Sequence, residues 1–470
     1  MGKENKIRGK DLYDIGYDDD GIRAMASTVL SSKFFKKMPK EDALSLLTSV
    51  KADPAKFVDD ERVSKLAYLF MSPAEPEIQF SVHELNEEPC PVKVYGSFHI
   101  EENAIKQMNI AARLPISVKG SLMPDAHPGY GLPIGGVLAA DNAVIPYGVG
   151  VDIGCRMALS VFEASEKYLK GRSYEFKSAL KEFTHFGNEG GLEFRQEHEI
   201  LDREEFTKPQ LLRNLHGKAA RQLGSSGSGN HFVEFGTIEL FEDNALGLNP
   251  GVYVGLLSHS GSRGLGASIA EYYTDLAMQT CKLPREARHM AWLELGTELG
   301  DEYWMAMNLA GDYARACHDR IHINLSKAIG LKPLTKIENH HNFAWKEMVD
   351  GRELVVHRKG ATPAAEGVFG IIPGNMVDPG YIVVGKGVSD SVNSAAHGAG
   401  RTMSRQDARE RISPSQMRKD LDKAGVELIG GATDEAPLAY KDIDGVMTAQ
   451  KQLIEVQGKF TPKIVRMNKE

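Results

Sequence analysis

The chain has 470 residues, of which 42% are hydrophobic and 26% are charged. These proportions are typical of a soluble globular protein with a sizeable core, and they exclude a disordered chain or a low-complexity fibre. The 64 acidic side chains outnumber the 56 basic ones, so the net charge is -8. A nucleic-acid partner would therefore have to bind a local basic patch rather than the surface as a whole.

No stretch reaches the ~18 uninterrupted apolar residues that a membrane span needs. The opening sequence, MGKENKIRGKDLYD, lacks the apolar region of a secretory signal. We therefore expect a cytoplasmic protein. The four cysteines are widely spaced and form no CxxC pair, which predicts reduced thiols, one of them able to bind a metal, rather than a disulfide framework; they are Cys90, Cys155, Cys281 and Cys317.

The first 80 residues are predicted to form a helical extension. Apolar side chains recur at helical spacing between Leu44 and Val50 and again between Val63 and Phe70. The stretch Ser-Pro-Ala-Glu-Pro at 72–76 predicts a linker at the end of this extension. Residues 81–470 are then expected to form a second, larger domain.

The larger domain is dominated by short β-type runs that end in glycine-rich turns. Clear examples are Val92–Tyr95, Val252–Leu257, Leu354–His357 and Tyr381–Val384. Two segments differ: 164–222 is charged and partly helical, which predicts a peripheral lobe, and 284–330 predicts two long helices. The expected fold class is α+β, with mixed β-sheets, surrounding helices and glycine-rich loops between 120 and 401.

Four histidines lie in turns rich in Gly, Asn and Ser, where small neighbours let a ligand approach the backbone. They are His231 in GSSGSGNHFVEFG, His259 in LLSHSGSRGLG, His341 in ENHHNFAW and His397 in SAAHGAGRTMSR. At these four positions a functional role is favoured over a purely structural one. Six others lie in helical or charged contexts and are expected to be structural: His185, His198, His216, His289, His318 and His322.

Asp152 and Cys155 stand three residues apart in VGVDIGCRM. Alone this spacing is weak evidence, because a buried cysteine can serve as a small apolar residue. Together with three of the loop histidines it supplies a carboxylate, a thiolate and three imidazoles. Five ligands exceed the needs of one tetrahedral site with an open position, and they suit two adjacent ions bridged by the thiolate. The thiolate favours zinc, while manganese and iron are also compatible.

Several loops also suit phosphate groups. LGSSGSGN and HSGSRGLG offer runs of small residues whose backbone N–H groups can surround an anion, and HRKGAT and HGAGR, with Arg405 nearby, add cations. Each loop could be no more than a tight turn, but the combination favours phosphate binding. The KxDG motif of lysine-dependent ligases is absent, since Lys441–Gly445 is one residue too long. A loop histidine is chemically able to form a covalent nucleotide adduct instead.

Nine motifs follow one another in a recognisable order: MPDAHPGYGLPIGGV, IPYGVGVDIGC, GSGNHFVEFG, HSGSRGLG, HHNF, RKGATPA, IPGNM, HGAGRTMSR and APLAYKDID. From about residue 90 to the C-terminus the chain resembles the RtcB family of RNA ligases. The resemblance implies an RtcB-type fold over 81–470 and a GTP- and Mn²⁺-dependent RNA ligase. Such an enzyme joins a 3′-phosphate or 2′,3′-cyclic phosphate end of RNA to a 5′-hydroxyl end, in RNA repair or tRNA splicing.

The resemblance also implies residue roles. Two Mn²⁺ ions would be held by Asp152, Cys155, His231, His259 and His341, and His397 would be the catalytic residue that becomes guanylylated. Lys469 is the candidate for a C-terminal lysine that contacts GTP. The expected GTP-binding positions are Asn230, His231, Phe232, Val233, Glu234, His341, Asn342, Pro373, Gly374, Asn375, His397, Gly398, Ala399, Gly400, Tyr440 and Lys469.

Three positions depart from the family pattern. Arg156 follows Cys155 where many members have glycine, Asn375 stands where PGSM is common, and the chain ends Lys469–Glu470 rather than Lys-Gly. With residues 1–80 outside the resemblance, these departures suggest a divergent bacterial paralogue with a specialised substrate.

Two other functions fit parts of the pattern. A dinuclear metallophosphodiesterase acting on RNA ends would need the five ligands but not His397. A catalytically silent RNA-binding accessory in repair or translation would need only the fold and its arginines. In the ligase, Arg263, Arg401 and Arg405 are candidate holders of RNA or triphosphate oxygens. Asp125 and His127, in PDAHPGYG, either line an RNA channel or form an ordinary turn.

Overall fold

The computed structural model describes residues 7–35, 38–71, 79–187 and 195–469. The chain divides into two compact units, Met1–Gln79 and Phe80–Glu470. The linker expected at 72–76 lies outside the described residues. Within the described part of the chain, no helix is both long enough and apolar enough to cross a membrane.

The first unit is helical and has a hydrophobic core of its own, in which Leu12, Tyr17, Leu47 and Leu66 are fully buried. The Tyr17 hydroxyl donates a hydrogen bond to the carbonyl oxygen of Leu47, at 2.8 Å, and so ties the connection between the first two helices to the third. The two apolar stretches expected from the sequence fall in α3 and α4. The elements are α1 (Gly9–Asp14), α2 (Asp20–Leu30), α3 (Lys40–Ala52), η2 (Pro54–Phe57) and α4 (Ser64–Met71).

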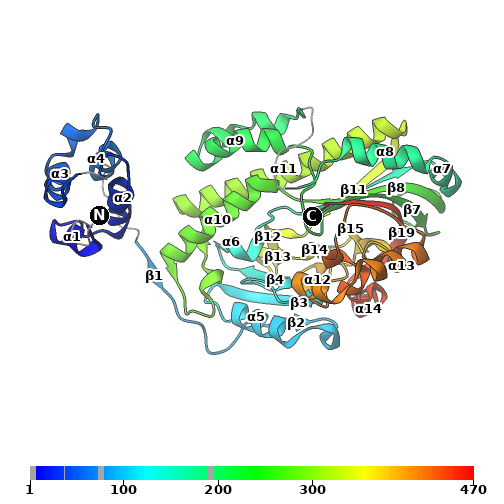
Figure 1. Ribbon diagram of the computed structural model, residues 1–470. Helices are drawn as coiled ribbons and strands as arrows, with labels where there is room; N and C mark the ends of the chain where they lie inside the picture. The colour runs from blue at the N-terminus through cyan, green and yellow to red at the C-terminus, as the bar shows by residue number, and fades with distance from the viewer. Residues whose placement is uncertain (1–6, 36–37, 72–78, 188–194, 470) are drawn as a thin grey trace. The chain divides into compact units, whose positions relative to one another are not determined.

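A large, mainly antiparallel sheet forms the centre of the second unit (Figure 1). Its order is β11 (Pro333–His340), β6 (Arg156–Phe162), β8 (Gly251–Ser260), β7 (Phe232–Leu240), β19 (Ile454–Met467), β16 (Gly380–Gly385) and β15 (Phe369–Ile372), with β18 (Glu427–Ile429) also paired to β19. β19 follows every other strand of this sheet in the sequence, yet it lies in the interior, between β7 and β16.

A five-stranded sheet stands beside it, in the order β12 (Asn342–Val349), β13 (Arg352–Lys359), β4 (Ile134–Ala140), β3 (Ser117–His127) and β2 (Val92–Val94). Three short pairs complete the strands. They are β14 (Ala361–Pro363) with β17 (Ser394–Ala396), β1 (Ser81–Val82) with β9 (Cys281–Lys282), and β5 (Ala143–Val144) with β10 (Leu293–Glu294).

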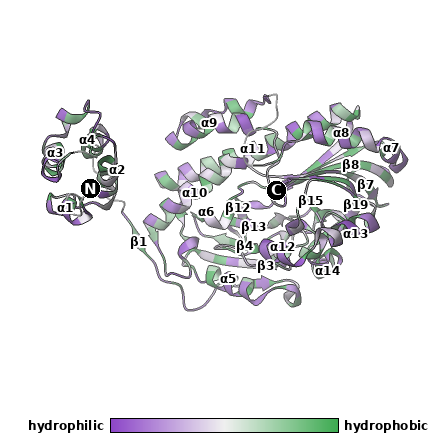
Figure 2. Ribbon diagram, in the orientation of Figure 1, coloured by the Kyte–Doolittle hydropathy of each residue, from purple (hydrophilic) through white to green (hydrophobic). Residues whose placement is uncertain are grey.

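Helices cover both sheets. In the view of Figure 1, α8–α11 lie on one side of the strands, and α5 and α12–α14 lie on the other. Figure 2 shows hydrophilic and hydrophobic residues mixed along these helices, as expected where one face packs on a core and the other meets water. The predicted mixed α+β fold is confirmed. The helices are α5 (Glu102–Ala112), α6 (Pro146–Val149), α7 (Glu166–Gly171), α8 (Ser173–Phe183), α9 (Gln210–Gln222), α10 (Arg263–Thr280), α11 (Glu298–Ile329), α12 (Arg405–Arg411), α13 (Pro414–Ala424) and α14 (Ile443–Ala449).

The segment expected to form a peripheral lobe, 164–222, contributes α7, α8, two short 3-10 helices and α9. On α8, Phe176 packs edge-on against Phe235 of β7, with ring centroids 4.8 Å apart. On α9, Leu212 and Ala219 belong to the same buried cluster as residues of α10 and α11. These helices therefore cover the large sheet and the long helices.

The prediction of two long helices in 284–330 is wrong, because this segment contains one. α11 begins after Thr297, whose side-chain oxygen accepts a hydrogen bond from the Gly300 N–H at 3.2 Å, and it ends at Gly330, which has φ +69°. The residues before it form the 3-10 helix η6 (Arg288–Met290) and then pair as β10 with β5. Pro284 and Gly296 bound that irregular stretch and keep it from joining the helix.

Candidate active site

Strand register brings the expected metal ligands to one edge of the large sheet. Antiparallel neighbours place the starts of β6 and β7 beside the ends of β8 and β11. In this register His259 of β8 pairs with both Met157 and Phe232, and His340 pairs with Arg156. The residues next to these pairs, Cys155, His231 and His341, are thereby held together although they are far apart in the sequence.

His341 lies where the chain passes from the large sheet, at the end of β11, to the five-stranded sheet, at the start of β12. Its backbone N–H donates to the carbonyl oxygen of Cys155, at 3.0 Å. His397 directly follows β17, whose last residue, Ala396, pairs with Ala361 of β14. The candidate nucleophile and the candidate metal ligands thus reach one space from separate sheets.

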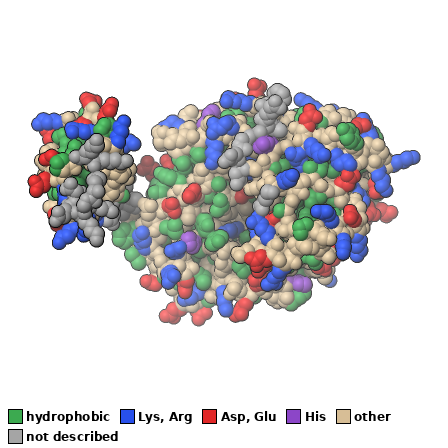
Figure 3. All heavy atoms as spheres, in the orientation of Figure 1, with side chains coloured by type: hydrophobic (Ala, Val, Ile, Leu, Met, Phe, Trp, Pro, Cys, Tyr) green, Lys and Arg blue, Asp and Glu red, His purple; other side chains and the backbone are tan. Residues whose placement is uncertain are grey.

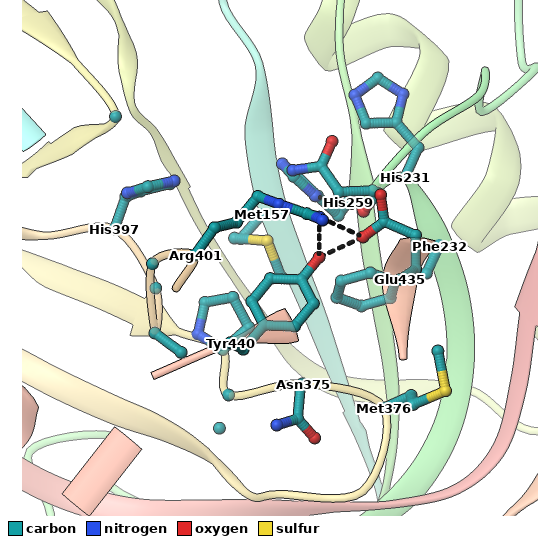
Figure 4. A pocket seen from close by; sticks show the side chains of 18 of the residues that line it. Met157, His231, Phe232, His259, Asn375, Met376, His397, Arg401, Glu435 and Tyr440 are labelled. Carbon is teal, nitrogen blue, oxygen red and sulfur yellow. Dashed lines mark hydrogen bonds and ion pairs between the residues drawn. The ribbon is translucent and has the colours of Figure 1, made fainter. Parts of the chain in front are cut away.

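That space is a cavity of about 350 Å³. All five expected metal ligands and His397 line it. Figure 4 labels three of them, His231, His259 and His397. In this view His397 lies on one side of the cavity, and His231 and Phe232 lie on the other. Most of the other expected GTP-binding positions also line the cavity, namely Asn230, Phe232, Glu234, Asn342, Pro373, Gly374, Asn375, Gly398, Ala399, Gly400 and Tyr440.

Two expected contacts are placed elsewhere. The Val233 side chain is fully buried in the hydrophobic cluster that includes Phe176, because neighbouring side chains of a strand point to opposite faces. Lys469 is exposed and does not line the cavity. Both GTP-binding roles stay predictions.

The donor atoms of the metal-ligand set lie close together. The Sγ of Cys155 is 3.2 Å from Nε2 of His259 and 3.5 Å from Nε2 of His231. The Nε2 atoms of His259 and His341 are 3.2 Å apart, and Oδ2 of Asp152 is 2.9 Å from Nε2 of His231. Among the described residues, the ligand atoms of Cys155, His231 and His259 form a group in which every pair lies within 4.8 Å.

Backbone carbonyls fix the tautomers that metal binding requires. Nδ1 of His231 lies 2.7 Å from the Ser226 carbonyl oxygen, and Nδ1 of His259 lies 3.0 Å from that of Asn230. A carbonyl only accepts, so each Nδ1 carries the proton and each Nε2 can turn a lone pair toward the cluster. The buried Nδ1 of His341 has no hydrogen-bond partner among the residues that the structure describes. A carboxylate, a thiol and three convergent imidazoles are a donor set that fits divalent metal ions.

Burial and neighbouring charge control the protonation of these groups. Burial raises the pKa of Asp152, but His231, Cys155 and Arg263 together outweigh burial and lower this pKa to about 2. Burial, reinforced by His231, lowers the pKa of His259 to about 3, and burial also lowers that of His341 well below its usual range. Burial raises the pKa of the Cys155 thiol well above its usual value. The imidazoles of His259 and His341 are therefore neutral at pH 7, and a bound metal would be what deprotonates the thiol.

Gly261 leaves room for the Asp152 carboxylate beside the other metal-ligand donors. The Ser262 N–H donates to Oδ1 of Asp152, at 3.1 Å. A Cβ at Gly261 would overlap that carboxylate. Glycine in HSGSRG is therefore required for close approach and not only for the turn.

The departure at Arg156 does not alter the cavity wall. Its side chain is buried outside the cavity, where it lies 3.6 Å from Glu338 of β11 and donates to the carbonyl oxygen of Gly311, at 3.1 Å. The guanidinium thus joins β6 to β11 and α11.

The departure at Asn375 has a structural role in the loop that lines the cavity. Its Oδ1 accepts from the N–H groups of Val377 and Asp378, each at 3.0 Å, and its Nδ2 donates to the Asp378 carboxylate at 2.7 Å. The amide closes the loop on itself, as a serine hydroxyl could do only in part.

His397 is oriented by a buried aspartate that sequence analysis did not pair with it. Oδ2 of Asp125, on β3, lies 2.7 Å from Nδ1 of His397 and also accepts the backbone N–H groups of His397 and Gly398, at 3.0 and 3.3 Å. Nε2 is thereby left free toward the cavity, and the ring centroid lies 4.8 Å from that of His341. Gly400, at φ +74°, packs against Asp125, where a Cβ would overlap the aspartate's carbonyl oxygen.

Two of the three arginines considered as phosphate holders line the cavity, but they already have acidic partners. Arg401 lies 3.4 Å from Glu435 and 5.2 Å from the centre of the Tyr440 ring, and the Tyr440 hydroxyl donates to the same carboxylate (Figure 4). Arg405 pairs with Glu435 and, at 3.0 Å, with Asp434. Sequence analysis missed both carboxylates.

Arg263, the third of these arginines, is buried outside the cavity. It donates to Oγ of Ser225 at 3.2 Å and to the carbonyl oxygen of Gly187 at 2.8 Å. Its role is to hold the glycine-rich loops in place.

Lys359 was also missed. It ends β13, lines the cavity and donates from Nζ to the carbonyl oxygens of Tyr147, at 3.1 Å, and of Tyr130. Burial lowers its pKa from 10.5 to about 7.

The free energy of unfolding of the wild type should therefore rise relative to that of Lys359→Met, in the wild type's favour, as pH increases from 7 to 10. In that range the unfolded wild type holds a proton that the folded state has released, so wild-type stability gains with pH and the variant lacks this gain. Urea unfolding at pH 7 and pH 9.5 should show a change on the order of 3 kcal/mol in the difference. The exposed Lys346→Met is the control, and parallel pH profiles for Lys359→Met and wild type would contradict the assignment.

Fold and cavity together define a mixed α+β protein with a candidate metal cluster beside a candidate histidine nucleophile. A family model described as tRNA-splicing ligase RtcB matches residues 107–206 and 180–468. The chain belongs to the RtcB family, as its motifs predicted.

Named relatives agree with this assignment. The RNA-splicing ligase RtcB of Escherichia coli K12 is 33% identical over 402 residues, covering 79% of this chain and 96% of that protein. The tRNA-splicing ligase RtcB of Methanococcus maripaludis is 33% identical over 422 residues, covering 74% and 87%. The RNA-splicing ligase RtcB homolog 1 of Entamoeba histolytica is 30% identical over 434 residues, covering 77% and 81%.

Proposed function

We propose that this protein is an RNA ligase that joins 3′-phosphate or 2′,3′-cyclic phosphate ends of RNA to 5′-hydroxyl ends through a covalent His397–GMP intermediate. The observation that carries the proposal is the placement of His397. Its Nδ1 is held by Asp125, its Nε2 is free, and it shares one cavity with the metal-ligand set. Membership of the RtcB family and the names of the relatives support the same activity.

Two divalent ions, which we propose to be Mn²⁺, would be held by Asp152, Cys155, His231, His259 and His341. The Cys155 sulfur lies within 3.5 Å of one imidazole nitrogen of His231 and one of His259, so the thiolate would hold metal together with these two ligands. When bound, the ions would neutralise charge that develops on phosphate oxygens during transfer.

The nucleotide would occupy the part of the cavity opposite His397. Phe232 offers a ring face there, and the loop closed by Asn375 offers backbone groups. Glu234 lines the same cavity, and burial raises its pKa well above the usual value. A buried carboxyl of this kind gains most from a ligand that hydrogen-bonds to it, as the N1–H and N2–H₂ donors of guanine can.

The chemistry follows from the tautomer of His397. Nε2 attacks the α-phosphorus of GTP, a P–N bond forms and diphosphate leaves, while Asp125 accepts the hydrogen bond from Nδ1–H as the ring becomes cationic. The GMP group then passes to the RNA 3′-phosphate. The 5′-hydroxyl attacks that activated phosphate and releases GMP. A cyclic end must first be opened to a 3′-phosphate by water.

RNA would bind through local contacts. Figure 3 shows Lys and Arg side chains interspersed with acidic ones over the visible face, in keeping with the net charge of -8. Such a surface does not hold a polyanion by general attraction. The expected RNA site is therefore the cavity and its rim. The cytoplasmic location of the protein stays a prediction.

Incubation of the protein with labelled GTP and Mn²⁺, followed by denaturing electrophoresis, tests the proposal. A ligase should carry label that is lost in acid and retained in alkali, as expected for a phosphoramidate. A phosphodiesterase should open cyclic ends without becoming labelled, and a silent accessory should do neither. An unlabelled wild-type protein that contains its metal ions would overturn the proposed function.

Asp125→Asn should reduce guanylylation on the order of 10²- to 10⁴-fold while leaving metal content unchanged. An amide can donate to Nδ1 and so place the proton on Nε2, which removes the nucleophilic lone pair. Single-turnover labelling with GTP measures the effect, and sealing of an RNA that already carries a 3′-guanylyl cap should persist. The exposed Asp141→Asn is the control. Equal labelling rates for Asp125→Asn and wild type would show that Asp125 does not orient His397.

A further inference from the structure

The loop between β3 and β4, residues 128–133, carries an exposed tyrosine on a fixed backbone. It is flanked by His127 and Ile134, which both line the cavity. The Gln107 side-chain amide donates to the Gly129 carbonyl at 2.5 Å and accepts its N–H at 3.0 Å, and the buried Lys359 donates to the Tyr130 carbonyl. The Tyr130 side chain is nevertheless 73% exposed. An aromatic ring is thus held in solvent beside the cavity.

Two further rings continue from Tyr130. Tyr147 lies with its ring centroid 6.3 Å from that of Tyr130, and His289 lies 5.4 Å from Tyr147 at an interplanar angle of 31°. Burial, reinforced by Arg288, lowers the pKa of His289, so its ring is neutral at pH 7. Tyr130, Tyr147 and His289 are called the aromatic rim below. His289 was expected from the sequence to have only a structural role.

Basic side chains lie beside the rings of the aromatic rim. Nζ of the buried Lys359 lies 5.0 Å from the centre of the Tyr147 ring, and the exposed Arg288 donates from Nε to Nε2 of His289 at 3.1 Å. Rings on which a base can stack, with a nearby guanidinium that can pair with a backbone phosphate, are what proteins use to bind single-stranded nucleic acid.

The aromatic rim leads directly to the candidate nucleophile. Lys359 is followed by Gly360, where a Cβ would lie 3.1 Å from Cε1 of His397. The Asn342 side chain, next to His341, accepts the Gly360 N–H at 2.8 Å. A strand whose terminal phosphate or hydroxyl lies at His397 therefore meets Lys359 and then the aromatic rim as it leaves the cavity.

We propose that the aromatic rim binds an unpaired base at the RNA end whose terminal group lies in the cavity, with Tyr130 as its outer stacking surface. This inference rests on the proposed function, because it assumes an RNA substrate. It also gives the enzyme a preferred substrate class, single-stranded ends, because an unpaired terminal base can turn its face toward Tyr130 without breaking a base pair.

Short RNAs with 2-aminopurine as the terminal base test this directly, because the fluorescence of this base falls when it stacks on an aromatic ring. One RNA carries the probe at a 3′-phosphate end and a second at a 5′-hydroxyl end, so the two arms identify the end that the rim holds. We expect the wild type to quench one of them. Tyr130→Ala should abolish the quenching, and Tyr130→Phe, which keeps the ring, should retain it.

Sealing kinetics give a second measure. Tyr130→Ala should raise the KM for single-stranded RNA on the order of 5- to 100-fold with a smaller change in kcat. Its self-guanylylation by GTP in the absence of RNA should equal that of the wild type. Tyr174→Ala, which removes a tyrosine 79% exposed on α8, is the matched control and should change none of these quantities.

The outcomes separate the two proposals. If the wild type quenches neither probe, or if Tyr130→Ala quenches as the wild type does, the aromatic rim is not an RNA site, whatever the labelling by GTP shows. If the wild type is not labelled by GTP but still quenches through Tyr130, the proposed ligase activity fails and the base-binding surface stands.

Discussion

His397→Ala is expected to keep its metal ions and its RNA binding but to lose all covalent labelling from GTP. The nucleophile is needed only to activate the 3′-phosphate, and its ring is held by Asp125 and not among the metal-ligand donors. The variant should therefore fail to join 3′-phosphate ends with GTP, a loss of at least ~10³-fold. Given RNA with a 3′-guanylyl cap, it should still seal to a 5′-hydroxyl end.

His341→Ala is the informative comparison because it removes a proposed metal ligand whose Nε2 lies 3.2 Å from that of His259. It should fail on both the 3′-phosphate and the capped substrate. If His397→Ala still acquires label from GTP, the nucleophile lies elsewhere. If it labels normally and only RNA binding falls, HGAGR is a phosphate-holding loop.

Cys155→Ala should abolish sealing and lower the affinity for both metal ions by more than ~10-fold. The thiol sulfur lies within 3.5 Å of imidazole nitrogens of both His231 and His259, and a bridging thiolate would contact both ions, so its removal should disturb both at once. Elemental analysis of the purified variant measures this. Cys317→Ala, which changes another buried free cysteine on α11, is the control. Full metal occupancy in folded Cys155→Ala would rule out a bridging thiolate.

The sequence allowed the residues around the cavity to be predicted because their loops have a distinctive composition. His231, His259, His341 and His397 each stand in a turn of small residues, and Asp152 and Cys155 follow a glycine-rich run. Such turns occur where the chain must approach a ligand or another segment closely, as Gly261 does beside Asp152. The structure brings all six side chains to one cavity.

Contacts between distant segments could not be predicted in this way. Asp125 is 272 residues from His397, and nothing in PDAHPGYG indicates that its carboxylate faces β17 rather than an RNA channel. The acidic partners of Arg401 and Arg405 were missed for the same reason. The Val233 side chain, by contrast, points away from the cavity for a local reason. Neighbouring side chains of a strand point to opposite faces, and β7 begins at Phe232.

The prediction for 284–330 failed because composition does not reveal where an irregular segment ends. Trp292 and Leu295 were assigned to the same helical pattern as Met307 and Leu309, yet the first two precede α11 and pack from the positions on either side of the short strand β10. Core packing needs only that these side chains face inward, and several backbone paths achieve this.

The interior position of β19 has a consequence for the protein during its synthesis. A nascent chain that has not yet released β19 from the ribosome has β7 and β16 with unpaired edges, so the large sheet stays in two parts. Tyr440 and Glu435 of the cavity wall also emerge late. The emerging polypeptide can already contain the metal-ligand residues and His397 while the wall of the cavity is still incomplete. Catalytic competence is therefore acquired after translation of almost the whole catalytic unit, and polysome-bound intermediates should not react with RNA ends.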